Sequence, residues 1–165
     1  MIRFAKISTL FFMFLMLWGC PQAESGSRIT DYEEVAITAV HNAAVGLGAV
    51  LQEMGTAEQI NFLRTFITPI RFYPDSTGYF YIYDYNCVNI AHAIQKDLEG
   101  KNLYDHRDSK GKYVIRELSA AAANGGGFVE FFWQKLNDLT EYRKLGYVEP
   151  IPGTDYFIGS GVYLK

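Results

Sequence analysis

The chain has 165 residues, of which 15 are basic and 18 are acidic, and its formal net charge is −3. This mildly acidic balance argues against a nucleic-acid partner, because nucleic acids are bound by basic patches. The two cysteines, Cys20 and Cys87, form neither a CxxC nor a CxxCH motif, which excludes zinc knuckles and covalently attached c-type haem. The length suits one domain with a sizeable core.

The N-terminal residues have the layout of a secretory signal. Two basic residues in MIRFAK precede the apolar stretch ISTLFFMFLMLWG, and Cys20 follows it. The stretch is too short and too one-sided for a membrane span. The motif LWGC resembles a bacterial lipobox, with Leu17 and Gly19 in the expected places and Trp18 larger than the usual residue.

We therefore expect residues 1–19 to be a signal peptide, Cys20 to be lipidated, and residues 20–28 to tether a single domain, residues 29–165, to a membrane. An uncleaved N-terminal anchor and simple secretion are the alternatives. All three place the domain outside the cytoplasm, and the lipidated form would be periplasmic. Without its first 19 residues the chain has 13 basic and 18 acidic residues. With Cys20 lipidated, no internal disulfide can form.

Two helices are predicted in the first half of the domain. From Ile29 to about Met54, apolar residues recur with helical spacing. The motif TAEQ at 56–59 has the form of a capping box, and a second helical apolar face follows it. Pro69 is expected to bend or end this second helix.

After Tyr73 the sequence becomes aromatic and β-branched, which is typical of strands. A further helix at 113–124 is expected to end at the glycines 125–127. Helices followed by strands, with one inserted helix, predict an α+β domain with a mostly antiparallel sheet. The long helices would cover one face of this sheet, and the 93–124 segment would close the other. The five predicted strands are 78–84, 88–93, 128–135, 144–150 and 155–164.

The order of several segments resembles a known family. GYFYIYD, NIAHA, LEGKNLYDHRDSKGKY, AANGGGFVEFFWQK and KLGYVEPIPGTDYFIGSGVYL together resemble the single Cache domain, type 2, over residues 30–164. This family comprises extracytoplasmic ligand-sensing domains of bacterial receptors, which also occur as free-standing proteins. The resemblance implies a PAS-like antiparallel sheet, a long N-terminal helix along one side, and a pocket for short carboxylates between the sheet and its cover.

The sequence departs from the family at three places. A turn that commonly contains Asp-Gly here has the sequence YNC, and Ala93 stands where the family tends to have proline. Most related receptors continue into a second membrane helix and signalling modules, whereas this chain stops at Lys165. We therefore expect a module with no output domain of its own, which passes its signal to a membrane-bound kinase or chemoreceptor. Pairing through the long first helix, as in related receptors, would give a homodimer.

Strand alternation identifies candidate ligand-binding residues. In FVEFFWQK, Phe131, Trp133 and Lys135 share one face, so an apolar wall ends in a cation. In YFYIY, Tyr79 and Tyr81 share a face with a third tyrosine. Buried hydroxyls need partners, and a carboxylate accepts several hydrogen bonds. The alternatives are plain core for the two large aromatics, a solvated strand end for the lysine, and a surface ladder for the tyrosines.

Two further candidates lie nearby. Arg71 follows the second helix and is placed to clamp a carboxylate, or else to pair with Asp75. His92 lies in a short apolar strand at a position where the family commonly has histidine; the alternative is a satisfied core residue. The residues DHRD at 105–108 are interpreted as turn residues and not as metal ligands.

The predicted function is therefore extracytoplasmic binding of a small organic acid such as acetate, propionate, lactate or pyruvate. The alternative is a structural or scaffold lipoprotein with the same fold and no ligand. The chain has no GxSxG, HExxH, P-loop or GxGxxG motif, so neither an enzyme nor a cofactor is expected.

Overall fold

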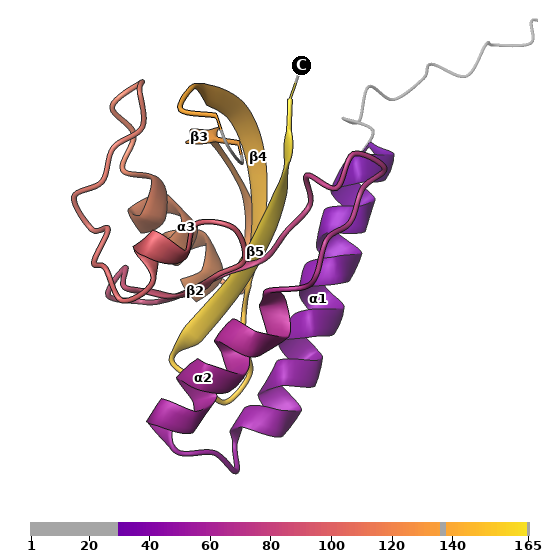
Figure 1. Cartoon of the computed structure of the whole chain (residues 1–165), viewed down its shortest axis with the longest axis vertical. Coiled ribbons are helices and arrows are strands. Elements are labelled where there is room, and N and C mark those ends of the chain that lie inside the picture. Colours follow the sequence, from indigo (N-terminus) through magenta and orange to yellow (C-terminus); the bar gives the residue numbers. More distant parts are fainter. Residues whose placement is uncertain (1–29, 136–137, 165) are drawn as a thin grey trace, which may run out of the picture.

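The computed structural model describes residues 30–135 and 138–164. Within them the chain forms an α+β domain with one five-stranded antiparallel sheet, as the sequence predicts (Figure 1). The strand order is β2-β1-β5-β4-β3. The predicted signal peptide, the lipidation of Cys20 and the tether lie outside the described residues. The elements are α1 (Asp31–Leu51), α2 (Thr56–Ile67), β1 (Tyr81–Asp84), β2 (Asn89–His92), the 3-10 helix η1 (Lys96–Leu98), α3 (Val114–Ala123), β3 (Gly127–Gln134), β4 (Glu141–Pro150) and β5 (Tyr156–Tyr163).

Helix α1 runs along one face of the sheet, where it contacts β4 and β5 (Figure 1). It begins with a capping box, in which the Thr30 side chain accepts from the Glu33 N–H and the Glu33 carboxylate accepts from the Thr30 N–H. Its length and composition would suit a membrane span, but its apolar stripe packs on the sheet as a core helix does. Gly48 lets Pro152 approach, since a Cβ there would lie 2.8 Å from the Pro152 carbonyl oxygen.

Helix α2 continues the cover of this face and contacts β2. The predicted capping box at 56–59 is wrong, because Gly55 is the N-cap residue and provides no side-chain hydrogen bond. The Gln59 side chain instead donates to the Leu51 carbonyl oxygen, which joins the ends of α1 and α2. The helix ends at Ile67, just before Pro69, as predicted.

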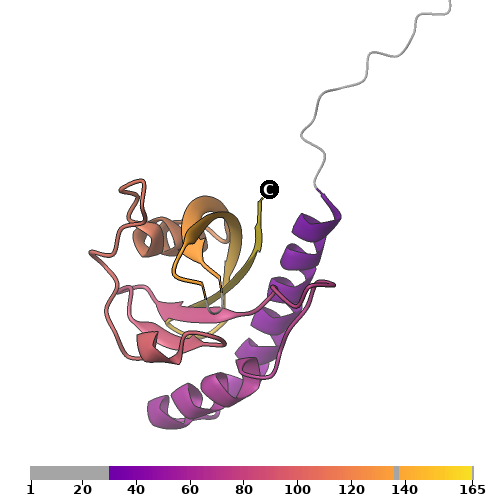
Figure 2. The same ribbon diagram turned by 45° about the horizontal axis from the view of Figure 1, so that its top comes forward.

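Helix α3 and the long loop before it cover the opposite face of the sheet (Figure 2). The helix ends where Gly125 and Gly126 adopt positive φ angles of 95° and 116°, which lets the chain turn sharply into β3. In the loop, the buried Asp108 carboxylate accepts backbone N–H groups of Lys110, Lys112 and Phe132. These bonds fasten the loop to β3 and give Asp108, the last residue of the DHRD segment, a structural role.

The strand register gathers one set of side chains on the α3 side of the sheet. Tyr81 pairs with His92 across β1 and β2, and Phe131 pairs with Lys144 across β3 and β4. Directly paired residues point to the same face, and the pairing of β5 with both β1 and β4 places the two pairs on the same side of the sheet. Gly159 pairs with Tyr81, and a Cβ there would lie 2.5 Å from the tyrosine ring. Glycine at this position of β5 therefore lets the Tyr81 ring lie flat on the sheet.

Candidate functional site

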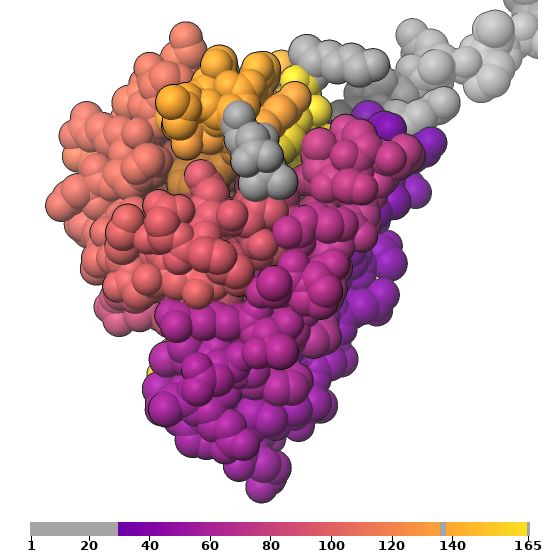
Figure 3. Space-filling model, viewed as in Figure 1, coloured from indigo at the N-terminus to yellow at the C-terminus, as the bar shows by residue number. Residues whose placement is uncertain are grey.

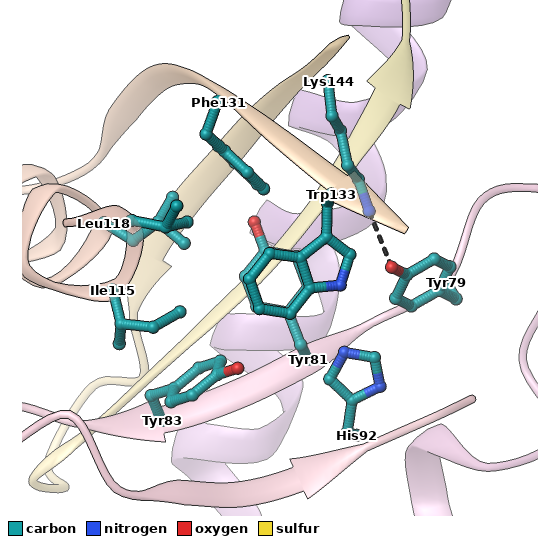
Figure 4. Close-up of a pocket in the computed structure, with 10 residues that line it drawn as sticks. Tyr79, Tyr81, Tyr83, His92, Ile115, Leu118, Phe131, Trp133 and Lys144 are labelled. Atoms are coloured by element: carbon teal, nitrogen blue, oxygen red, sulfur yellow. Dashed lines mark hydrogen bonds between the residues drawn. The ribbon is translucent and has the colours of Figure 1, made fainter. Parts of the chain in front are cut away.

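A small cavity lies between the sheet and α3 (Figure 4). The volume open to the centre of a water-sized sphere is about 10 Å³, which is room for about one water molecule. Each of its lining residues is at most 7% exposed, so the cavity is closed. The lining residues are Tyr79, Tyr81, Tyr83, His92, Val114, Ile115, Leu118, Phe131, Trp133 and Lys144.

The cavity has one charged end and one end with aliphatic side chains, and the Tyr81 hydroxyl is drawn beside Phe131 (Figure 4). Lys144, Tyr79 and His92 lie together at the charged end. Ile115 and Leu118 of α3 lie at the other end. The rings of Tyr81 and Trp133 lie between the two ends. A ligand that suits such walls combines a charged or strongly polar head with a short apolar body.

Lys144 is the unusual residue of the site. Its side chain is 1% exposed, and its Nζ donates a 2.9 Å hydrogen bond to the Tyr79 hydroxyl. Nζ also lies 4.0 Å from the Tyr79 ring centroid, which is cation–π distance. Burial lowers the pKa of the Lys144 ammonium from 10.5 to about 7. Within residues 30–135 and 138–164, no acidic side chain forms an ion pair with it.

His92 is a neutral hydrogen-bond donor at physiological pH. Its Nδ1 accepts backbone N–H groups of Gln95 at 2.9 Å and Ile94 at 3.4 Å, which places the ring proton on Nε2. Burial lowers the pKa of His92 to about 3, and the positive charges of Lys144, Lys96 and Arg71 add to this shift. The same positive field that keeps this imidazole neutral favours an anion in the cavity.

The tyrosines supply further donors. Burial raises the pKa of Tyr79 and of Tyr81 well above the usual value of 10.0, so both phenols stay protonated. The Tyr81 hydroxyl donates to the Ser160 carbonyl oxygen at 3.3 Å, a long bond that a better acceptor would replace. Burial also raises the pKa of Tyr83, and the side-chain amide of Asn89 offsets part of this shift. This amide is fully buried and has no hydrogen-bond partner among the described residues.

Five of the seven predicted site residues line the cavity: Tyr79, Tyr81, His92, Phe131 and Trp133. Arg71 and Lys135 do not. They lie on the far side of Tyr79, in an open hollow of about 360 Å³. The Arg71 guanidinium there donates to the carbonyl oxygens of Thr68, Ile70 and Ala93, so much of it is engaged by backbone.

Sequence reasoning missed Lys144 and did not select Tyr83 as a site residue. The signal for Lys144 was weak because the strand containing it was predicted to begin there, and a strand-end lysine is ordinarily solvated. Strand β4 in fact begins at Glu141, which places Lys144 inside the sheet. Only the register against Phe131 reveals that its side chain faces the cavity.

The family model dCache_2, described as a Cache domain, matches residues 43–165. The chain belongs to the Cache domain family. The resemblance inferred from the sequence is confirmed at the level of the family, although the matching model is dCache_2 and not the single-domain type 2 model. Cache domains are sensor domains, and the closed cavity lies between the sheet and its cover, where the resemblance places the pocket.

Two characterised receptors are similar to part of this Cache domain. The sensor histidine kinase MctS of Rhizobium johnstonii is 40% identical over 87 residues, which is 53% of this chain and 19% of the kinase. The methyl-accepting chemotaxis protein CtpM of Pseudomonas aeruginosa is 33% identical over 88 residues, which is 53% of this chain and 16% of the receptor. The matched segment therefore spans less than a fifth of either relative.

Solved structures give the same fold. A methyl-accepting chemotaxis protein from Vibrio parahaemolyticus superposes with a TM-score of 0.70 at 31% identity, over 79% of this chain and 87% of that structure. A Cache chemosensory domain solved for its recognition of carboxylic acids superposes with a TM-score of 0.71 at 26% identity, over 80% of this chain and 92% of that structure. This Cache domain is thus related to the sensor domains of chemoreceptors and histidine kinases.

Proposed function

We propose that this Cache domain binds a short-chain monocarboxylate in the closed cavity, with Lys144 as its cationic anchor. The observation that carries the proposal is the buried Lys144 ammonium without an acidic partner among the described residues. A buried cation without a counter-ion costs folding free energy. Such a cost is typical of a residue kept for binding, because a ligand carboxylate supplies the missing charge.

The groups beside Lys144 suit a carboxylate head. A carboxylate has two oxygens that together accept about four hydrogen bonds, and charge-assisted bonds are the strongest. The Lys144 ammonium, the Tyr79 hydroxyl and the His92 Nε2–H are donors of the required kind at one end of the cavity. Tyr81 becomes a fourth donor if its 3.3 Å bond to Ser160 is exchanged for the ligand.

The other end limits the body of the ligand. Val114, Ile115 and Leu118 are at most 1% exposed and offer only apolar contact. A second carboxylate at this end would lie in an apolar environment without a cation, which is costly. A cavity of about 10 Å³ is smaller than acetate needs, so the ligand must displace wall side chains or shift α3 as it binds. We propose that this shift is the event that the sensor reports.

The test is calorimetric titration of the purified protein with acetate, propionate, lactate and pyruvate. We expect one or more of these acids to bind, and Lys144→Met to abolish the binding while the circular dichroism spectrum stays native. Lys101→Met is the matched control, because Lys101 is a solvent-exposed lysine on the loop after η1. Binding that persists in Lys144→Met would overturn the role of this residue. No binding of any acid by the unsubstituted protein would overturn the proposed function.

The closed state of the cavity favours one alternative, a scaffold whose pocket is filled by its own side chains. The two functions differ in a thermal-shift experiment, because a ligand that binds only the folded protein raises the melting temperature. A scaffold would show no shift with any of the four acids. Its Lys144→Met variant would be more stable without any loss of function.

We also propose where the domain lies in the cell and which protein receives its signal. One structural neighbour, at 25% identity and a TM-score of 0.69, is described as the periplasmic sensor domain of a chemotaxis protein. We place this domain likewise outside the cytoplasm, held to a membrane through lipidated Cys20. Its signal would be received by a membrane-bound kinase or chemoreceptor, in keeping with the two characterised relatives. A homodimer would form through α1, whose outer side exposes Val35, Val45 and Val50.

A further inference from the structure

A ligand reaches the closed cavity only if a wall residue moves. Two wall residues also line outer hollows. Tyr79 separates the cavity from a hollow of about 360 Å³, and Trp133 separates it from a hollow of about 150 Å³. We call them the Tyr79 hollow and the Trp133 hollow. Their charges differ, and this difference decides which of them an anion will use.

The Tyr79 hollow is net positive. Arg71 and Lys135 lie in its wall with one acidic residue, Asp75, so its formal charge is +1. The Thr77 side chain hydrogen-bonds the Asp75 carboxylate and lowers its pKa, and nearby Lys135 lowers it further. The charge of Arg71 extends to the cavity, because it contributes to the lowered pKa of His92.

Three segments distant in sequence build this hollow. They are the segment after α2, Lys135 just after β3, and the end of β5 at Tyr163; Ile94, just after β2, completes the wall. Figure 3 shows the end of β5 between the β3–β4 hairpin and the segment after α2. The Lys135 Nζ lies 4.3 Å from the Tyr142 ring centroid and 5.1 Å from that of Tyr163, so aromatic rings hold this cation at the rim. The Asp138 carboxylate, which does not line the hollow, is also near enough for Lys135 to lower its pKa.

The Trp133 hollow is net negative. Asp97 and Glu141 lie in its wall together with no lysine or arginine, so these carboxylates give it a formal charge of −2. The Lys101 ammonium, outside this wall, lies 3.6 Å from the Asp97 carboxylate. Trp133 itself is fastened, since its Nε1–H donates to the Gln95 side chain at 2.8 Å and its ring packs edge-on against His106. An anion on this route would approach two carboxylates before it reached the Trp133 ring, which these contacts hold in place.

We infer that the Tyr79 hollow is an outer subsite for the carboxylate, in which Lys135 and Arg71 capture the anion before it passes Tyr79 to Lys144. This inference rests on the proposed function. The hydroxyl of Tyr79 is bonded to the Lys144 Nζ, so the ring that closes this route is tied to the group that receives the ligand. When the carboxylate arrives, it replaces the Tyr79 hydroxyl as the hydrogen-bond acceptor of the Lys144 Nζ. The Tyr79 ring can then close over the bound ligand.

The experiment is stopped-flow mixing of the protein with propionate, followed by tryptophan fluorescence. One unit charge near the path of the anion changes its local concentration in water about two- to fivefold. We expect Lys135→Gln to slow association by about that factor, and Lys135→Glu, which changes two unit charges, by about four- to twenty-fivefold. The dissociation rate should stay within about twofold, because Lys135 does not line the cavity. The salt dependence of association should weaken in Lys135→Gln.

Two controls make the result specific. Lys101→Gln removes an exposed lysine outside the Tyr79 hollow and should leave association unchanged. Asp97→Asn removes one negative charge from the Trp133 hollow and should also change little. An unchanged association rate in Lys135→Glu would overturn the inference. So would an increase in the association rate of Asp97→Asn that is larger than the decrease in Lys135→Gln. If the unsubstituted protein binds none of the four acids, the proposed function fails first, and the outer subsite fails with it.

Discussion

The Lys144 ammonium donates to the Tyr79 hydroxyl at 2.9 Å inside the domain, where the two side chains are 1% and 3% exposed. The phenol is a neutral partner, so it satisfies one N–H without compensating the charge. Burial therefore lowers the pKa of Lys144 to about 7. At neutral pH the site is balanced between a charged and an uncharged lysine, and a carboxylate shifts that balance towards the charged form.

The first prediction concerns the stability of Lys144→Met. The native pKa of about 7 lies below the unfolded value of 10.5, so the unfolded state binds more protons between these limits. The folding penalty of the lysine is thus complete below pH 7 and disappears as the pH approaches 10.5. We expect Lys144→Met to raise the free energy of unfolding at pH 6 by about 1–3 kcal/mol, after allowance for the lost bond to Tyr79.

Urea denaturation of both proteins from pH 6 to pH 9.5 measures this difference. The gap between the variant and the unsubstituted protein should narrow as the pH rises. A variant that is less stable at pH 6 than the unsubstituted protein would mean that Lys144 stabilises the fold, and the argument for a binding role would be lost.

The second prediction concerns the pH dependence of binding. The charged form of Lys144 binds the carboxylate, and above pH 7 this form must be regenerated by proton uptake. The dissociation constant for propionate should therefore be nearly constant below pH 6 and about double between pH 6 and pH 7. Above that it should rise towards about tenfold per pH unit. His92, with a pKa of about 3, contributes nothing in this range.

Calorimetry at pH 8.5 in two buffers of different ionisation enthalpy measures the proton uptake directly. We expect close to one proton to be taken up for each acid bound. Binding without proton uptake would show that the head of the ligand does not contact Lys144.

The third prediction concerns acid stability. The His92 pKa is lowered from 6.5 to about 3, so the unfolded state binds an extra proton between these values. The contribution of neutral His92 to the free energy of unfolding is therefore fully present above pH 6.5 and is lost as the pH falls towards 3. His92→Asn keeps an acceptor for the Gln95 N–H but does not titrate, so its stability should fall less between pH 6.5 and pH 4. Equal slopes in the two urea series would contradict the lowered pKa of His92.

The fold was largely predictable from the sequence, because its elements depend on local patterns. The helical stripe of α1, the glycines after α3 and the alternation of β3 correctly indicated an α+β domain. The capping box was predicted at the wrong helix, since Thr-x-x-Gln at 56–59 and Thr-x-x-Glu at Thr30 and Glu33 have the same local form. They differ in which residue is the N-cap: Thr30 is the N-cap of α1, whereas Thr56 is already the first residue of α2 and Gly55 is its N-cap.

The site was less predictable, because it depends on register and on depth. Alternation placed Tyr79, Tyr81, Phe131 and Trp133 in the cavity wall without knowledge of the pairing. It could not distinguish Lys135, at the end of β3, from Lys144, one strand away. Which of two lysines is buried depends on where β4 begins and which residue it pairs with, and neither is encoded in a window of ten residues.

The fourth prediction concerns Gly146, which leaves space on β4 between two wall residues. A Cβ at this position would lie 2.7 Å from the Phe131 ring and 2.8 Å from the Tyr81 hydroxyl. Gly146→Ala should therefore fill part of the cavity and overpack its wall, lowering the free energy of unfolding by about 1–3 kcal/mol. It should also weaken propionate binding, because the side chains displaced by the methyl group are those that contact the ligand.

The matched control is Gly46→Ala, on the exposed side of α1. No atom lies within 4 Å of a Cβ there, so alanine should raise the free energy of unfolding by about 1 kcal/mol through its higher helix propensity. Propionate binding should be unchanged in this variant. Urea denaturation and calorimetry of both variants separate the two effects: a Gly146→Ala protein that is destabilised but binds propionate normally would place the ligand away from Phe131 and Tyr81, and the closed cavity would no longer be its site.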